Sequence, residues 1–295
     1  MSPKTSDIVL GGRFMGLFIG VNGSGKTIAA ASFPGDGLII DFDGRVDPVK
    51  YFYPNRTDID YWTVGLKGDN RRGAIDFTDA LKMIEDFQDN CPYDWIVFDS
   101  YTSYSATAVF YQMGIRDAKT LKRTLGGLPI PDWDEYKGET STMMQILEVL
   151  KILPCNVIVT GHPIFSAKTL KQGGTTNETL GSMVKASSLS SYGWKTQSFL
   201  PNYFNEIHYF YTDVANQPGR DNRYMVRTQS MGEIVAKTAL PLPAAFEITG
   251  KPYYDVVQTI LKGYNLELQR KNEARLKSKL AVVKSKLAED EEIRS

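Results

Sequence analysis

The chain has 295 residues and 42% apolar content, which is enough for one large hydrophobic core, or for one core with a small appendage. Lysine plus arginine and aspartate plus glutamate both number 34, so bulk charge does not indicate a nucleic-acid binder, and such a role would need local patches. The two cysteines, Cys91 and Cys155, have no paired spacing, which disfavours a disulfide framework or a zinc site and fits a reducing compartment.

Short apolar runs alternate with helical periodicity through the first two-thirds of the chain. The expected strands are residues 14–19, 37–41, 61–64, 95–98 and 156–160, and the expected helices are residues 27–32, 74–88 and 135–153. Strands that alternate with helices predict a parallel sheet with right-handed crossovers. Residues 95–98 are apolar throughout, as expected of a strand covered on both faces.

The pattern changes in the last third of the chain. Residues 207–211 and 223–228 predict two antiparallel strands around the turn-rich stretch 216–219, and residues 265–295 are charged and helix-prone. We therefore expect an α/β fold with a mainly parallel sheet, an antiparallel C-terminal extension and a charged C-terminal helix. The expected division is a main domain, residues 1–262, and a helical tail, residues 263–295.

One glycine-rich segment carries a specific chemical signal. Residues 20–27, GVNGSGKT, fit the pattern G-x-x-x-x-G-K-[ST] between an expected strand and an expected helix. Glycines allow successive backbone N–H groups to wrap a phosphate, the lysine contacts the β- and γ-phosphates, and the threonine hydroxyl is a Mg²⁺ ligand. The predicted nucleotide-binding residues are Gly20, Asn22, Gly23, Ser24, Gly25, Lys26 and Thr27, with ATP or GTP and Mg²⁺ as ligands.

Acidic residues end two of the expected strands. Asp99 closes the run 95–98, where an aspartate beside the phosphate-binding loop holds Mg²⁺, although Asp99 and Ser100 also suit a helix N-cap. Asp41 and Asp43 end the strand at residues 37–41. From spacing alone, two interpretations stay open: one of these two acids polarises the attacking water, or Asp43 forms an Asx-type turn with Gly44.

With these motifs in order, residues 14 to about 165 resemble the RecA-like ATPases, especially small phage-encoded RecA-fold recombination proteins. The resemblance rests on residues 20–27, on LIIDFDGRVDP at 38–48, on IVFDS at 96–100 and on VIVTGH at 157–162. It implies ATP as the nucleotide and catalytic roles for Lys26, Asp43, Asp99 and His162. Asp43 stands where the family carries a longer glutamate, and His162 stands where it carries a glutamine that senses the γ-phosphate.

The resemblance also implies DNA binding and assembly of several subunits. In RecA-like proteins the loop after the sensor strand faces DNA, and here that loop is residues 164–198, which are rich in Gly, Ser, Thr and Lys. The candidate DNA-binding residues are Lys168, Lys171, Lys185, Tyr192, Trp194 and Lys195. Lys237 resembles a lysine that reaches the neighbouring subunit's γ-phosphate in a ring or filament. A solvated loop and an ordinary surface lysine are the alternatives.

The function that these inferences favour is Mg²⁺-dependent ATP hydrolysis by a homo-oligomer acting on single-stranded DNA in phage-type recombination, annealing or repair. Two alternatives stay open: a P-loop kinase of a small molecule or nucleotide, and an ATP-dependent assembly or DNA-packaging factor. Residues 1–8 lack the apolar core of a signal peptide, and no apolar run approaches the roughly 20 residues that span a bilayer. We therefore expect no membrane association and a cytoplasmic location, in a bacterium or a phage-infected host.

Overall fold

A nine-stranded sheet forms the centre of the protein. The computed structural model describes residues 13–65, 74–115, 122–123, 129–163, 200–213, 222–231 and 234–294. The strands of the sheet are β1 (Met15–Gly20), β2 (Gly37–Asp41), β3 (Ile59–Gly65), β4 (Ala74–Asp76), β5 (Trp95–Asp99), β8 (Asn156–Gly161), β9 (Glu206–Asp213), β10 (Arg223–Arg227) and β11 (Ala245–Glu247), in the order β11-β10-β9-β1-β8-β5-β2-β3-β4.

Most neighbouring strands in this sheet are parallel. The pairs from β9 through β1, β8, β5, β2 and β3 to β4 are all parallel, whereas β10 pairs antiparallel with both β9 and β11. A mainly parallel sheet with an antiparallel C-terminal extension was predicted, and it is confirmed. The sequence alone did not show that β9 also pairs in parallel with β1 and so joins the extension to the phosphate-loop strand.

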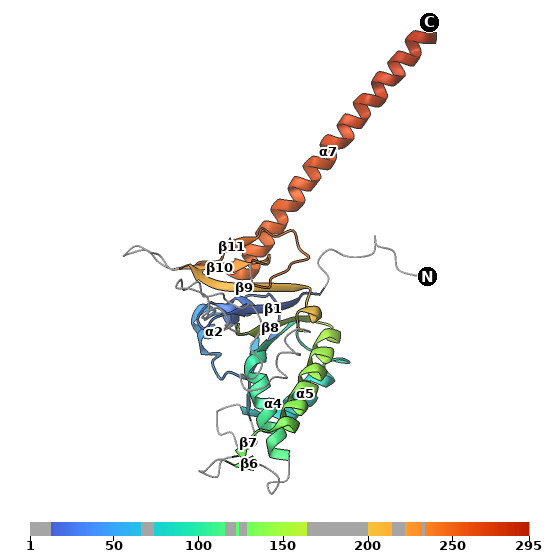
Figure 1. The fold of residues 1–295 in the computed structure, drawn as a ribbon. Helices are drawn as coiled ribbons and strands as arrows, with labels where there is room; N and C mark the ends of the chain where they lie inside the picture. Colours follow the sequence, from blue (N-terminus) through green and yellow to red (C-terminus); the bar gives the residue numbers. More distant parts are fainter. Residues whose placement is uncertain are drawn as a thin grey trace, which may run out of the picture.

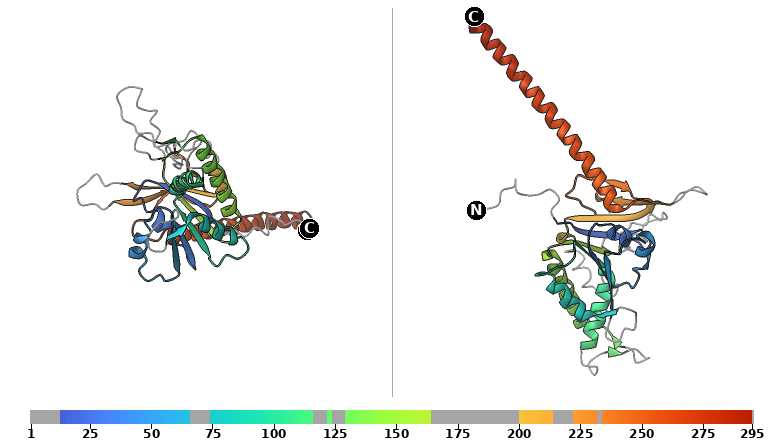
Figure 2. Two further views of the ribbon diagram at one scale, coloured as in Figure 1. Left: turned by 90° about the horizontal axis from the view of Figure 1, so that it is seen from below. Right: turned by 180° about the vertical axis from the view of Figure 1, so that it is seen from behind.

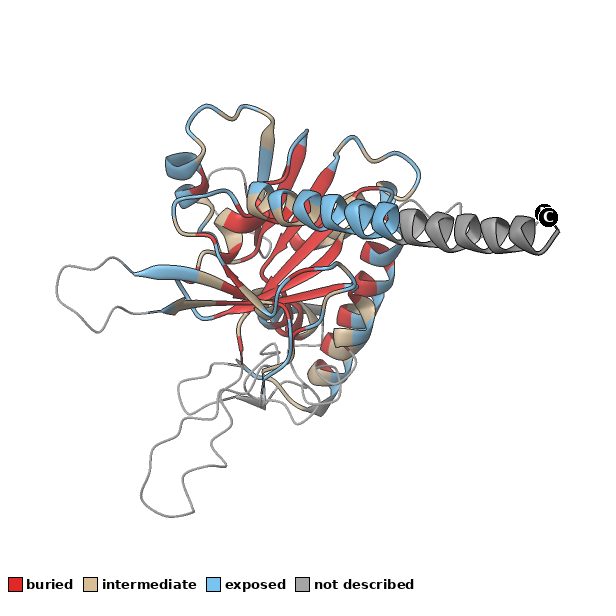
Figure 3. Cartoon of the chain, turned by 90° about the horizontal axis from the view of Figure 1, so that it is seen from above, coloured by how far each residue is buried: buried red, intermediate tan, exposed pale blue. Residues whose placement is uncertain are grey.

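Helices cover both faces of the sheet, and each face has its own apolar core. On one face, α3 (Phe77–Asp86), α4 (Tyr101–Ile115) and α5 (Trp133–Ile152) pack on side chains such as Leu17 and Ile40. On the other face, α1 (Lys26–Ala30), α2 (Asp47–Phe52) and the start of α7 (Tyr253–Arg294) pack on side chains such as Phe18 and Ile39. Neighbours along a strand point to opposite faces, so apolar strands supply both cores. Figure 3 shows the buried strands between exposed outer elements.

One expectation about local structure is wrong. Residues 74–76 are the edge strand β4 rather than the first turn of a helix, because Asp76 adopts an extended conformation and its Oδ1 accepts the Thr78 N–H at 2.9 Å, which caps α3. A separate two-stranded sheet is formed by β6 (Lys122–Arg123), which pairs antiparallel with β7 (Pro129–Ile130).

The C-terminal helix α7 is one continuous element of 42 residues. Its first turns contribute the buried Tyr253 and Val257 to the core, and it then leaves the body of the domain (Figures 1 and 2). The expected boundary between residues 262 and 263 therefore lies within one helix. The charged C-terminal helix was predicted, but its rooting in the main core was not.

Candidate functional site

The glycine-rich segment joins a buried strand to the short helix α1. Every residue of β1 is buried, which fixes the start of the loop, and Gly23 and Gly25 adopt positive φ angles of 76° and 89° that other residues rarely tolerate. The Lys26 ammonium donates to the carbonyl oxygens of Gly20 at 2.8 Å and Val21 at 3.0 Å, across the mouth of the loop. The loop thus has the torsions and the lysine position that phosphate binding requires.

Burial perturbs two charges beside this loop. Desolvation lowers the pKa of Lys26 to about 8, although the negative charges of Asp99 and Asp43 oppose that shift. Desolvation raises the pKa of Asp99, opposed by hydrogen bonds from the Thr160 and Thr27 hydroxyls. The site thus holds an ammonium and a carboxylate that water does not fully solvate, and both would gain from a bound ligand of opposite charge.

Asp99 and Thr27 meet directly beneath the loop. The Thr27 hydroxyl donates to Asp99 Oδ2 at 2.8 Å, and the Thr160 hydroxyl from the adjacent strand β8 donates to Asp99 Oδ1. The peptide bond between Asp99 and Ser100 is cis. The Asp99 carboxylate is thus held between a threonine of α1 and a threonine of β8, one on each oxygen.

The two acids at the end of β2 have different roles in the structure. Asp41 is buried, and its carboxylate accepts the backbone N–H groups of Gly44 at 2.7 Å and Val46 at 3.2 Å. Asp41 therefore forms the Asx-type turn that the sequence suggested for Asp43 and Gly44. Gly44 has a φ of 68°, which this turn requires. Asp43 is left with its carboxylate facing the pocket.

Asp43 lies between the ends of three strands. Its Oδ1 accepts the Ser100 hydroxyl at 2.8 Å, and its Oδ2 is 3.7 Å from His162 Nε2. Burial on its own would raise the pKa of Asp43, but the neighbouring polar side chains of His162, Ser103 and Ser100 outweigh it and lower the pKa to about 2. The backbone N–H of His162 donates to Thr102 Oγ1 at 3.1 Å, which anchors the end of β8 to α4. Asp43 therefore stays ionised at any ordinary pH.

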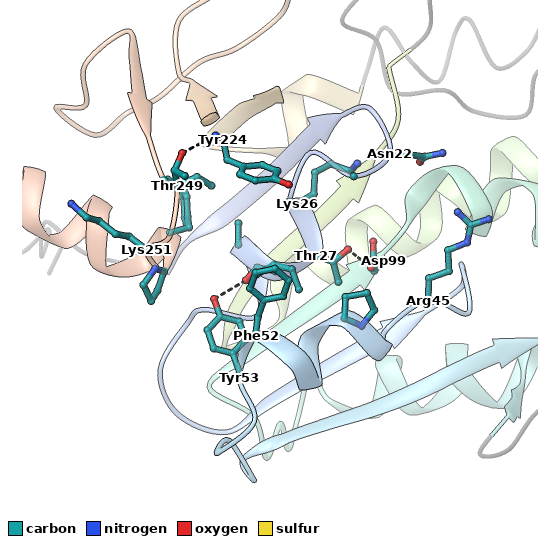
Figure 4. A pocket seen from close by; sticks show the side chains of 18 of the residues that line it. Asn22, Lys26, Thr27, Arg45, Phe52, Tyr53, Asp99, Tyr224, Thr249 and Lys251 are labelled. Carbon is teal, nitrogen blue, oxygen red and sulfur yellow. Dashed lines mark hydrogen bonds between the residues drawn. The ribbon is translucent and has the colours of Figure 1, made fainter. Parts of the chain in front are cut away.

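A pocket of about 500 Å³ contains these groups and extends well beyond them. One end is polar and is lined by Asn22, Asp43, Arg45, Asp99 and His162; the other is largely aromatic and aliphatic and is lined by Phe52, Tyr53, Tyr224, Ile248, Thr249, Lys251 and Pro252. Lys26 and Thr27 lie between the two ends (Figure 4). The pocket is thus elongated along the loop, with different chemistry at its two ends.

Several of these residues were not identified from the sequence. Arg45 was noted only as part of the motif at residues 38–48. Phe52 ends α2, and Tyr53 is the next residue. Tyr224 and Thr249 come from the antiparallel extension, where no motif marks them. The Tyr224 ring lies over the loop, since a Cβ at Gly25 would be 3.7 Å from Tyr224 Cδ1. The only sequence signal for this end of the pocket was the presence of aromatic residues.

The remaining candidates lie elsewhere or outside the described residues. Lys237 pairs with Ile207 at the edge of β9, and its ammonium donates to the Pro201 carbonyl oxygen at 2.8 Å. It does not line the pocket of its own chain. The candidate DNA-binding residues Lys168, Lys171, Lys185, Tyr192, Trp194 and Lys195 lie outside the part of the chain that the structure describes.

The donor set fits a hydrated Mg²⁺ bound together with a nucleotide. A threonine hydroxyl beside a carboxylate offers hard oxygen ligands, and Mg²⁺ commonly uses one or two protein ligands plus phosphate and water. Among the described residues there is no cluster of three or more histidine, cysteine, aspartate or glutamate side chains that would hold a metal alone. Thr27 and Asp99 are therefore the residues that would hold Mg²⁺, with phosphate oxygens completing the shell.

Comparison with known proteins identifies the family. A family model described as an AAA domain matches residues 13–240, and the chain belongs to this family. No curated protein is significantly similar to the chain. Two similar solved structures are a KaiC-like protein from the archaeon Pyrococcus horikoshii OT3 and the flagellar accessory protein FlaH from Methanocaldococcus jannaschii.

Both structural similarities are distant. The KaiC-like protein is 13% identical over 85% of this chain and 93% of its own, with a TM-score of 0.39. FlaH is 10% identical over 81% of this chain and 87% of its own, with a TM-score of 0.36. The family match and the observed sheet confirm the predicted α/β fold, with a mainly parallel central sheet that carries a phosphate-binding loop. Separately, none of the helices in the described ranges combines the length and the apolar character needed to cross a bilayer.

Proposed function

We propose that this protein hydrolyses ATP with Mg²⁺. The observation that carries the proposal is that residues at the ends of β2 and β5 meet the phosphate loop at one pocket. There the Thr27 hydroxyl donates a hydrogen bond to Asp99, and Asp43 lines the same pocket. A buried lysine, a metal-binding pair and a separate ionised acid are the parts that phosphoryl transfer to water needs.

The two ends of the pocket support one orientation of ATP. The loop fixes the position of the phosphates, so the base and the terminal phosphate must lie in opposite directions from Lys26. The aromatic end, with Tyr224 over the loop and Phe52 across from it, offers flat apolar surfaces for a purine. The polar end then receives the γ-phosphate and the attacking water.

The described side chains can be given distinct tasks at the polar end. Lys26 would contact phosphate oxygens, and Mg²⁺ held by Thr27 and Asp99 would supply charge neutralisation. Asp43 would accept a hydrogen bond from the attacking water and orient it. Because its pKa is about 2, Asp43 is a weak base, so orientation rather than early proton removal is the role that fits.

His162 provides a route from the γ-phosphate to the segment that follows it. Its ring is 3.7 Å from Asp43 and its backbone is tied to Thr102, and residues 164–198 begin immediately afterwards. We propose that this segment contacts single-stranded DNA in a homo-oligomer and that phosphate occupancy alters this contact. This part of the proposal rests on the RecA-like resemblance and on the position of His162.

The first experiment is ATP hydrolysis by the purified protein, with and without single-stranded DNA, beside Lys26→Ala and Asp43→Asn. We expect Mg²⁺-dependent turnover that both variants lower by at least roughly 10²-fold, while only Lys26→Ala weakens nucleotide binding. Stimulation by DNA would support the recombination role. Turnover that DNA leaves unchanged would reject that role and favour an assembly factor.

A second assay addresses the kinase alternative. ATP labelled at the γ-phosphate is incubated with the protein and with candidate nucleosides or nucleotides, and the products are separated. Label in inorganic phosphate alone agrees with the proposal. Transfer of label to an acceptor, with little free phosphate, would contradict the assignment of water as the nucleophile.

A further inference from the structure

We propose that Arg45 is a catalytic residue that contacts the γ-phosphate of the ATP bound by its own chain. This inference rests on the proposed ATPase function and adds a charge-stabilising group within the same subunit. It differs from the role considered for Lys237, which would act across a subunit interface.

The backbone around Arg45 is fixed by the buried acid Asp41. The Asp41 carboxylate accepts the N–H groups of Gly44 and Val46, the residues on either side of Arg45. The left-handed conformation of Gly44 completes this turn. The backbone on both sides of Arg45 is therefore held in place by a buried residue, although Arg45 itself is exposed.

This turn brings Arg45 and Asp43 to the same pocket. Both line it, and Figure 4 shows the Arg45 side chain on the side of Thr27 where Asp99 and Asn22 lie, away from Thr249. The phosphate loop sets where the β-phosphate lies, and the polar end receives the group beyond it. Arg45 is therefore located near the γ-phosphate rather than near the base or ribose.

Negative charge predominates at the polar end of the pocket when ATP is bound, so a further cation there would be stabilising. Asp43 and Asp99 bring negative charge, and ATP adds more, while the Lys26 ammonium is shared with two backbone carbonyl oxygens. Arg45 is solvent-exposed, and its guanidinium has no hydrogen bond or ion pair within the described ranges. A planar guanidinium can donate two parallel bonds to phosphate oxygens, a geometry that lysine cannot reproduce.

The chemical consequence is stabilisation of charge during phosphoryl transfer. As the bond to the leaving β-phosphate breaks, negative charge is distributed over oxygens that a guanidinium at this place would contact. Removing one preorganised donor of this kind lowers turnover by roughly 10²–10³-fold. The same contact already exists with bound ATP but is absent with ADP, which lacks the γ-phosphate.

The test compares Arg45→Ala and Arg45→Lys with Lys50→Ala, an exposed basic residue on α2 that does not line the pocket. Affinities for a non-hydrolysable ATP analogue and for ADP are measured with Mg²⁺, together with turnover of ATP. For Arg45→Ala we expect at least tenfold weaker analogue binding, ADP binding within about twofold of wild type, and turnover lowered by roughly 10²-fold. Arg45→Lys should recover only part of the turnover.

The outcomes separate this inference from the proposed function. Analogue and ADP affinities that are both unchanged, or both weakened equally, would overturn the assignment of Arg45. If the wild type binds the analogue but does not hydrolyse ATP, the ATPase proposal fails, and the analogue-to-ADP comparison still decides the Arg45 contact. A wild type that binds no nucleotide would overturn both. Thermal unfolding of each variant confirms that the fold is kept, which the exposure of Arg45 leads us to expect.

Discussion

The lysine of the phosphate loop should make nucleotide affinity depend on pH in the alkaline range. Lys26 is buried, and desolvation lowers its pKa from 10.5 to about 8 when no ligand is bound. ATP needs the ammonium form, because the neutral amine offers the phosphates no charge. Raising the pH through 8 therefore removes the form that binds.

The magnitude follows from the fraction of Lys26 that is charged. With a pKa of about 8, most of the side chain is charged at pH 7 and about one-eleventh is charged at pH 9. Provided that bound phosphates hold the ammonium fully charged, affinity for MgATP should fall about tenfold between these two pH values. Below pH 7 the contribution of Lys26 should level off.

In the protein without nucleotide, the free energy of unfolding should rise over the pH range in which nucleotide affinity falls. A pKa lowered from 10.5 to about 8 means that the folded state disfavours the charged lysine by about 3 kcal/mol, at 1.36 kcal/mol per pH unit. Between these pKa values the unfolded chain binds more protons, so the free energy of unfolding should rise with pH, as far as Lys26 contributes. The charged form of Lys26 thus lowers the stability of the nucleotide-free protein and favours nucleotide binding.

The assay is binding of a fluorescent ATP analogue with Mg²⁺ at pH 7, 8 and 9. Lys251→Ala, which removes the other lysine of the pocket, should keep the tenfold change. Lys26→Arg should abolish the change, since arginine stays charged throughout this range. An affinity for the wild type that is constant from pH 7 to 9 would refute the reasoning, because Lys26 would then keep its charge in the empty site.

Three further predictions follow from contacts described above. Asp43→Asn should lower turnover by roughly 10²–10⁴-fold with nucleotide affinity nearly unchanged in equilibrium binding, since Asp43 orients water and does not hold the phosphates. Tyr224→Ala should weaken binding of ATP and ADP to the same extent in titration calorimetry, because the base is common to both. Tyr253→Phe should lower the free energy of unfolding by about 1–3 kcal/mol in urea, because the buried His208 Nδ1 loses the hydroxyl 2.7 Å away.

The parallel core and the phosphate loop could be predicted because their signals are local. The expected strand at residues 37–41 coincides with β2, and the glycine spacing of residues 20–27 identifies the loop without any tertiary information. Helix α4 was not predicted. Tyr104, Ser105 and Ala108 are all buried on it, and small polar residues between the aromatics leave no clear apolar stripe.

The roles of Asp41 and Asp43 could not be separated from spacing. Both acids lie at the end of the same apolar strand, and both suit a turn or a water contact. Their difference arises because Asp41 is still part of β2 and is buried, where it must find N–H donors, and the turn supplies them from Gly44 and Val46. Asp43, beyond the strand, is then free to face the pocket. The expected strand already ended at Asp41, but spacing does not show which of the two carboxylates accepts the N–H groups of Gly44 and Val46.

The aromatic end of the pocket depends on packing between segments far apart in the sequence. Tyr253 begins α7, lines the pocket and contacts His208 on β9. Because the Tyr253 hydroxyl donates to His208 Nδ1, the other ring nitrogen, Nε2, donates to Glu206 at 3.0 Å. The His208 ring stacks on Phe18, in the strand that leads into the phosphate loop. One buried network therefore connects the root of α7, the antiparallel extension and the loop strand. Because Phe18, His208 and Tyr253 are all buried, this network makes the start of α7 part of the core beside the pocket.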